Sequence, residues 1–225
     1  MKIIDLAQPI WNEGPNCPAH PPLSVRVEKH TSDALNSWQI EHFAFASHSG
    51  SHIDAPLHKI RGGRGLETFD LGDFEGRAHL CDLRSCAPNE AIDRVRLEPF
   101  ARPQWQGEIV LLATGWGQKR AKTPEWLRQS PYLNASGAQF LVEQGVRAVG
   151  IDHYSVGGSA EPRNAHTHQI LLGAGLWIVE ELRFPDEIFA FPSFQFQAFP
   201  LNVINLEGGI SGAPCRPLAR VELST

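Results

Sequence analysis

The sequence contains no long apolar run and no cluster of basic residues. No stretch approaches the roughly 18 consecutive apolar residues that a membrane-spanning helix needs, so we expect no membrane span. The formal net charge is −5, from 20 basic and 25 acidic residues. Because no basic patch is present, we expect no non-specific binding to the phosphate backbone of nucleic acids.

Cysteines are also scarce and show no paired spacing. The chain has 4 cysteines in 225 residues and no CxxC pair, unlike the disulfide framework of a small secreted protein. The opening residues, MKIIDLAQPIW, hold one Lys, and Asp5 interrupts their apolar run, so no signal peptide is expected. These features predict reduced thiols and a cytoplasmic protein.

The remaining composition is that of a folded protein. Hydrophobic residues make up 42% of the chain and charged residues 20%, which excludes a disordered chain. The length suits one large domain, and we find no linker or internal repeat. We therefore expect a single domain over residues 1–225.

Strand patterns outnumber helical ones. Alternating or wholly apolar segments predict strands at 24–29, 38–46, 77–83, 108–114, 146–151, 176–179 and 194–199. Capping residues at 134–136 and Gly145 predict a helix between them, and a second, short helix is predicted from His166 or Thr167 to Leu172. The patterns together predict a mixed α/β fold with a β-rich sheet and a few helices.

Histidines are unevenly distributed: 4 of the 10 lie between residues 42 and 58, where residues 47–59 read SHSGSHIDAPLHK. Four metal-ligand types share even positions there: His48, His52, Asp54 and His58. In an extended chain, residues of one parity point to one side. Pro56 disfavours a helix and pushes Ala55 towards an extended conformation, and Gly50 would leave room between two histidines.

Imidazole and carboxylate together suit Zn²⁺, Fe²⁺ or Mn²⁺. The alternative is a polar loop whose histidines cap turns and bind water. Because four ligand-type side chains share one parity, the pattern favours a metal site. His42, which lies in a predicted strand, is expected to be structural.

The segment His48-x-Gly50-x-His52-x-Asp54-x-Pro56-x-His58 resembles the signature of the cyclase-like metal-dependent hydrolases, of the bacterial kynurenine formamidase and isatin hydrolase type. Ser51 stands where that family usually has Thr. The likeness extends to residues 3–10 (IIDLAQPI), 145–152 (GVRAVGID), 168–180 (HQILLGAGLWIVE) and 208–221. It therefore covers essentially the whole chain.

This resemblance implies a ligand set and a fold. His48, His52 and Asp54 would bind one divalent ion, Zn²⁺ or Mn²⁺, and Asp54 would bridge to a second ion held by His168 and Glu180. His58 matches the family's catalytic histidine. The resemblance also implies a swivelling β/β/α fold and a homodimer, with the active site near the subunit interface.

The implied activity is hydrolysis of an amide bond in a small-molecule substrate. A bound ion lowers the pKa of water from 15.7 to about 7 and polarises a carbonyl group. Metal-bound hydroxide would attack the carbonyl carbon, and His58, with an ordinary pKa near 6.5, would move a proton to the leaving amine. An aryl formamide such as N-formylkynurenine is the first candidate substrate, and a cyclic amide such as isatin, cleaved with Mn²⁺, is the alternative.

Two other functions remain open from the residues. His52, Asp54 and His168 also fit the two-histidine, one-carboxylate set of non-haem Fe(II) oxygenases, and a metal-binding protein without turnover is the second rival. Glu180, at the end of an apolar strand, could instead pair with Arg183.

Several further residues have expected roles beside the ligand set. Trp11, in a Pro- and Gly-rich loop, is the candidate substrate-binding aromatic residue. Core packing is expected for Phe43, Trp116, Phe194 and Phe196. Asp152 is expected to be structural. The spacing of His166 to Leu171 and Leu172 does not match the ligand pattern, and Glu181 is one residue out of register, so neither has an assigned role.

Overall fold

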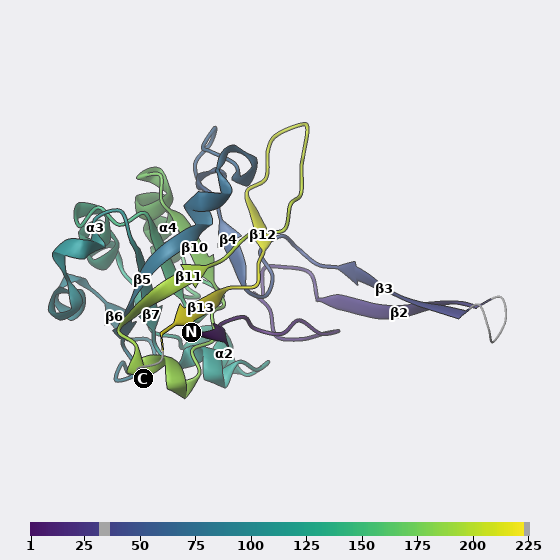
Figure 1. Ribbon diagram of the computed structural model, residues 1–225, viewed down its shortest axis with the longest axis horizontal. Helices are drawn as coiled ribbons and strands as arrows, with labels where there is room; N and C mark the ends of the chain where they lie inside the picture. The colour runs from purple at the N-terminus through teal and green to yellow at the C-terminus, as the bar shows by residue number, and fades with distance from the viewer. Residues whose placement is uncertain (32–36, 223–225) are drawn as a thin grey trace.

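One mixed sheet forms the centre of the computed structural model, which describes residues 1–31 and 37–222 (Figure 1). Its nine strands lie in the order β1 (Lys2–Asp5), β13 (Leu218–Val221), β11 (Ser193–Gln197), β5 (Glu75–Asp82), β7 (Ile109–Ala113), β9 (Ala148–Ile151), β10 (Trp177–Glu180), β4 (His52–Asp54) and β12 (Gly212–Pro214). Strands β5, β7, β9 and β10 are parallel, and the outer pairs are antiparallel. The predicted β-rich α/β fold is confirmed.

The sheet curls around one of its own faces. Ile4 and Phe196 come from one end of the strand order and Ile53 and Val179 from the other, yet all four lie in one buried apolar cluster. A bridge between Ala7 and Leu182 brings the continuation of β1 against the chain that follows β10. Burial of apolar area inside this curl is the main source of stability expected for such a core.

Helices cover the opposite face of the sheet. A second apolar cluster lies between the sheet and these helices. It combines side chains of β7, β9 and β10 with those of α1 (Arg94–Leu97), α3 (Ala135–Glu143) and α4 (Arg163–Gly173). The predicted helix after residue 134 is α3, because Asn134 Oδ1 accepts a hydrogen bond from Gly137 N, and Gly145 has a φ of 72°. The second predicted helix is α4, which begins at Arg163, three or four residues earlier than expected.

Smaller elements complete the body. Helix α2 (Pro124–Arg128) follows β7, and a short parallel pair joins β6 (Ala91–Ile92) to β8 (Tyr132–Leu133). No helix in the described residues combines the length and apolar character needed to cross a membrane. The four cysteines are free.

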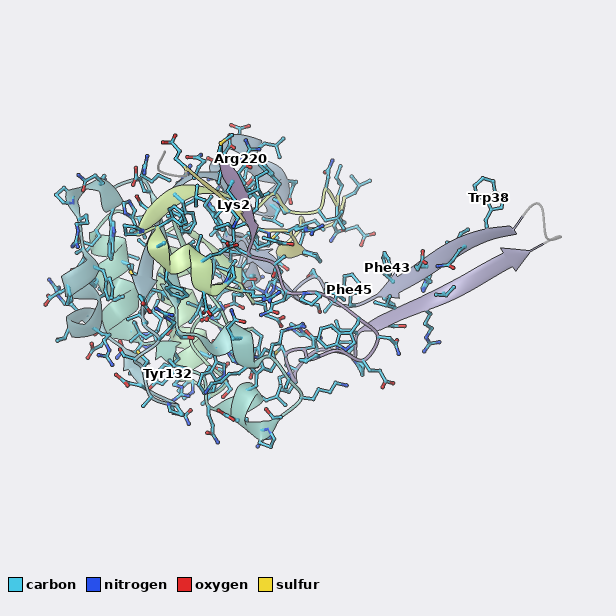
Figure 2. The ribbon with its side chains drawn as sticks, turned by 60° about the horizontal axis from the view of Figure 1, so that its bottom comes forward. Lys2, Trp38, Phe43, Phe45, Tyr132 and Arg220 are labelled. Carbon is cyan, nitrogen blue, oxygen red and sulfur yellow. The ribbon has the colours of Figure 1, made fainter. Side chains whose placement is uncertain are left out.

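A two-stranded antiparallel ribbon projects from this body (Figures 1 and 2). It consists of β2 (Ser24–Thr31) and β3 (Ser37–Ala44), as the strand patterns predicted. Trp38 is 74% exposed and Phe43 is 61% exposed on this arm. The prediction of core packing is therefore wrong for Phe43. Alternation of apolar and polar residues shows that the two faces of a strand differ, but it does not show that another layer of the protein covers the apolar face. Trp116, Phe194 and Phe196 are buried, as expected.

Candidate metal centre

Strand β4 supplies two of the predicted ligands. It covers only residues 52–54, and its alternation places Ile53 in the apolar cluster inside the curl, with His52 and Asp54 on the opposite face. The extended run predicted through residue 58 is wrong, since residues 56–58 form a 3₁₀ turn. Pro56 starts that turn instead of preventing it, because a proline at the first helical position forfeits no hydrogen bond. His58 is therefore placed by the turn and not by strand parity.

A tight turn brings His48 back over β4. Gly50 has a φ of 63°, a conformation that favours glycine, and a Cβ there would lie 2.7 Å from Ile10. The glycine thus serves the turn and its contact with Ile10, not the spacing between histidines that the sequence suggested. The turn places His48 Nδ1 2.6 Å from Asp54 Oδ1.

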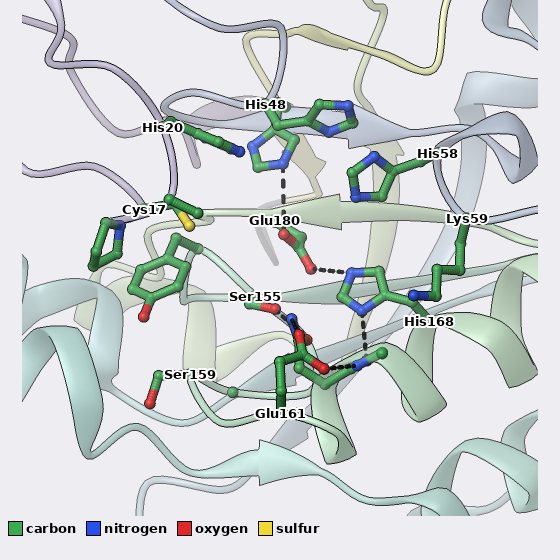
Figure 3. Close-up of a pocket in the computed structure, with 17 residues that line it drawn as sticks. Cys17, His20, His48, His58, Lys59, Ser155, Ser159, Glu161, His168 and Glu180 are labelled. Atoms are coloured by element: carbon green, nitrogen blue, oxygen red, sulfur yellow. Dashed lines mark hydrogen bonds and ion pairs between the residues drawn. The ribbon is translucent and has the colours of Figure 1, made fainter.

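The other two ligand candidates come from β10 and α4. Glu180 ends β10, which pairs with β4 so that Glu180 lies opposite His52. His168 projects from α4, which packs over this end of the sheet (Figure 3). Glu180 Oε1 also accepts a hydrogen bond from Val156 N at 2.6 Å, and no described contact pairs Glu180 with Arg183. Segments more than 100 residues apart in the sequence therefore meet at one point.

Asp54 lies at the middle of the cluster. His52 Nε2 is 3.3 Å from Asp54 Oδ1, and His168 Nε2 is 3.5 Å from Asp54 Oδ2. His58 Nε2 lies 4.0 Å from Asp54 Oδ2. Glu180 completes the group, at 3.5 Å from His52 Nε2 and 3.3 Å from His168 Nε2. The structure thus brings all six predicted ligand and catalytic side chains together.

Hydrogen bonds fix which nitrogen of two imidazoles faces the cluster. His52 Nδ1 lies 2.7 Å from Gly50 O, and His168 Nδ1 lies 2.9 Å from Asn164 O. A carbonyl oxygen can only accept, so in both rings Nδ1 carries the proton, and the lone pair of Nε2 points towards the carboxylates when the ring is neutral. This is the orientation of a histidine that ligates a metal through Nε2.

Two buried polar atoms at the centre lack a hydrogen-bond partner within the described residues: His52 Nε2 and Asp54 Oδ2. An unpaired buried polar atom is costly, and a cation would satisfy both. The residues therefore fit a divalent ion. Ligand-type atoms gather in two sets that share Asp54, one with His48 and His58, the other with His52 and Glu180. This grouping differs from the implied one, because His58 joins His48, His52 joins Glu180, and His168 belongs to neither set.

Burial and the neighbouring carboxylates shift the pKa values of the histidines in opposite directions. Burial alone would lower the pKa of His168, but the carboxylates of Asp54 and Glu180 raise it to about 10. For His58, burial outweighs the attraction of Asp54 and lowers the pKa to about 4. His168 thus holds a proton that an entering cation must displace, whereas His58 is neutral at pH 7.

A pocket of about 490 Å³ opens onto this cluster, a size that suits a small organic molecule. His20, Lys59, Ser155 and Glu161 line it beside the ligand candidates. Sequence reasoning missed these four residues, because they come from loops and helix ends whose patterns carry no periodic signal. Trp11 is not among the lining residues; it is 44% exposed, and the guanidinium of Arg120 lies 5.1 Å from its ring centroid. Its role in substrate binding stays a prediction.

Asp152, His166 and Glu181 lie outside the cluster of ligand candidates. Asp152 accepts hydrogen bonds from Thr114 N at 3.0 Å and from Gly117 N at 3.2 Å, which fits the structural role expected for it. His166 is exposed on α4 and does not line the pocket. Glu181 turns away from the cluster, and its Oε2 lies 2.9 Å from Arg120 Nε.

Arg120 connects Glu181 to the loop that carries Trp11. The side chains of Arg120 and Glu181 are 3% and 1% exposed, and Arg120 also donates to Pro9 O at 2.9 Å and to Pro15 O at 2.8 Å. We expect Arg120→Met to lower the free energy of unfolding by about 3–5 kcal/mol, because it leaves a buried carboxylate without its partner. Urea denaturation measures this loss.

The matched control is Arg220→Met, which removes an exposed guanidinium from β13. We expect that change to alter stability by less than about 0.5 kcal/mol. Equal stability of the two variants would contradict the anchoring role of Arg120.

The sequence is similar to those of known proteins over nearly its whole length. The family model Cyclase, described as "Putative cyclase", matches residues 4–157. Kynurenine formamidase of Bacillus cereus is 31% identical over 218 residues, covering 96% of this chain and 97% of the relative. The corresponding protein of Bacillus anthracis is 30% identical over 220 residues, covering 96% and 98%.

Solved structures agree in fold. A structure described as a predicted metal-dependent hydrolase from Bacillus stearothermophilus is 28% identical, with a TM-score of 0.76 and 97% of each chain covered. Isatin hydrolase A from Ralstonia solanacearum has a TM-score of 0.80 at 23% identity, covering 98% of this chain and 92% of that chain, which is a likeness of fold. The match of the family model and the full-length relatives lead to one conclusion: this chain belongs to the cyclase family.

Proposed function

We propose that this protein is a metal-dependent hydrolase that cleaves the amide bond of an aryl formamide, N-formylkynurenine being the leading candidate. The observation that carries the proposal is the cluster of imidazoles and carboxylates at the inner end of the pocket, in which His52 Nε2 and Asp54 Oδ2 are buried without a hydrogen-bond partner among the described residues. Relatives named kynurenine formamidase that match over nearly the full length support the choice of a formamide.

The proposed ligands of the ion are those of the sequence analysis: His48, His52, Asp54, His168 and Glu180. Zn²⁺ and Mn²⁺ both suit this set of nitrogen and oxygen donors. A divalent ion bound there would supply Lewis acidity, lowering the pKa of water to about 7 and polarising the carbonyl group. Asp54 lies in both ligand sets, so the residues accommodate one ion or two.

The chain's own groups position and move protons. His58 lines the pocket with its side chain 32% exposed, so its imidazole reaches the space where a substrate binds. Because burial keeps His58 neutral at pH 7, it can accept a proton from water and deliver it to the amine nitrogen as the C–N bond breaks. The products would be formate and an aryl amine. The carbonyl oxygens of Gly50 and Asn164 keep His52 and His168 in fixed orientations throughout.

An activity panel tests the proposal. Metal is removed with a chelator, Zn²⁺, Mn²⁺ or Fe²⁺ is added back, and turnover of formanilide, N-formylkynurenine and isatin is measured with and without oxygen. We expect formamide hydrolysis that is lost with the metal and regained with it. Preference for isatin would favour the cyclic-amide alternative. Turnover only with Fe²⁺ and oxygen would favour an oxygenase, and bound metal with no turnover of any substrate would favour a binding protein.

The implied homodimer and the cytoplasmic location stay predictions. Light scattering of the purified protein measures the first. A homodimer would have twice the 24.9 kDa mass of the chain.

A further inference from the structure

The outer part of the pocket carries one positive and one negative side chain. The buried ligand candidates occupy the inner end, whereas Lys59 and Glu161 are exposed and line the same cavity (Figure 3). Among the described residues, neither forms an ion pair, with the other or with a third group. Two unneutralised charges of opposite sign therefore face one substrate-sized space.

Lys59 is held at the backbone next to the proposed acid–base residue. It ends the 3₁₀ turn after β4, and its backbone N donates to Pro56 O at 3.2 Å. The side chains of Lys59 and His168 both line the pocket (Figure 3). Lys59 therefore enters the pocket from the turn that follows β4.

Glu161 enters the pocket just before α4 and is held by the first turn of that helix. Its carboxylate accepts hydrogen bonds from Ala165 N at 3.1 Å and from Asn164 Nδ2 at 3.3 Å. Asn164 is fixed in turn, because its Oδ1 accepts from Ser155 Oγ at 2.5 Å. A carboxylate has about four acceptor sites, so Glu161 is oriented by two of them and keeps others for a ligand.

We propose that Lys59 and Glu161 bind the carboxylate and the ammonium of an α-amino-acid group carried by the aryl formamide. A ligand group with one negative and one positive charge complements both Lys59 and Glu161. Hydrogen bonds between charged groups are also stronger than those between neutral groups. The inference rests on the proposed function, because the formamide would lie at the metal cluster while its amino-acid end lies at these two residues. A neutral cyclic amide such as isatin would gain nothing from either.

Kinetics with truncated substrates test the pair. N-formylkynurenine has both charged groups, and formanilide has neither. We expect Lys59→Met and Glu161→Gln each to raise the KM for N-formylkynurenine about 10-fold, the lower end of what a hydrogen bond to a charged group contributes, and to leave the KM for formanilide unchanged. A deaminated analogue that keeps the carboxylate should respond only to Lys59→Met.

Matched controls are Lys122→Met and Glu207→Gln, which remove exposed charges that do not line the pocket. They should change neither KM. The inference is overturned if Lys59→Met and Glu161→Gln change the KM for formanilide as much as that for N-formylkynurenine, or change neither.

A binding measurement keeps this inference separate from the proposed function. Calorimetry with kynurenine, which has the amino-acid group but no formamide, should show binding that each pocket variant weakens about 10-fold and that aniline does not reproduce. If no formamide is hydrolysed but kynurenine binds in this way, the proposed function fails and the amino-acid site stands. If formamides are hydrolysed and kynurenine binds equally to wild type and variants, the amino-acid site fails.

Discussion

Replacing Asp54 with Asn should remove both metal and activity while leaving the fold intact. Asp54 is buried in β4 and faces His48, His52, His58 and His168, so the substitution keeps its volume but removes the charge on which the cluster is centred. We expect bound metal to fall below one-tenth of the wild-type content and formamide turnover to fall at least about 100-fold, the upper end of the effect of groups that merely orient ligands.

Metal analysis after dialysis, a formamide assay and circular dichroism measure these three quantities. Asp186→Asn, an exposed carboxylate at the start of a 3₁₀ turn, is the matched control and should behave as wild type. Retained metal and turnover in Asp54→Asn would mean that the cluster is not the metal centre.

Replacing His58 with Ala should lower kcat by about 100- to 10,000-fold with the metal retained, because that is the range for removal of a general acid–base. The side chain is the most exposed of the cluster, so the loss of packing is small. His166→Ala on the exposed side of α4 is the matched control and should leave kcat unchanged.

Metal content decides what a loss of activity in His58→Ala means. His58 lies with His48 and Asp54 in one of the two ligand-type groups, and the ring centroids of His48 and His58 are 3.9 Å apart. Loss of one ion together with activity would make His58 a ligand. Activity that survives with metal in place would refute a role for His58 in proton transfer.

The parts of the site that follow from local rules could be predicted from sequence. Alternation placed His52 and Asp54 on one face, and a capping Asn with a terminal glycine marked α3, since each signal spans only a few residues. The meeting of β4 with β10 and α4 depends on pairing across more than 100 residues. His168 and Glu180 were therefore predicted as ligands from the resemblance to a family, because no local pattern in the chain indicates them.

The wrong predictions concern sequence signals that are compatible with two different structures. Pro56 was expected to keep the chain extended, yet it begins a turn, because proline fits both conformations. Phe43 lies in a genuine strand, but on a ribbon with no layer over it. Lys59 and Glu161 gave no signal, because isolated surface charges show no periodicity until the fold places them on one cavity.

The register of β4 has a consequence for insertions and deletions. Its three residues are paired on both sides, with Asp54 opposite Ile178 and Gly212. Inserting one residue after His52 would turn Asp54 towards the apolar interior and break the cluster. The ribbon of β2 and β3 is joined to the body only at its base, so its length can change without moving this register. Variation in chain length among proteins that keep this centre should therefore concentrate in the arm and spare β4.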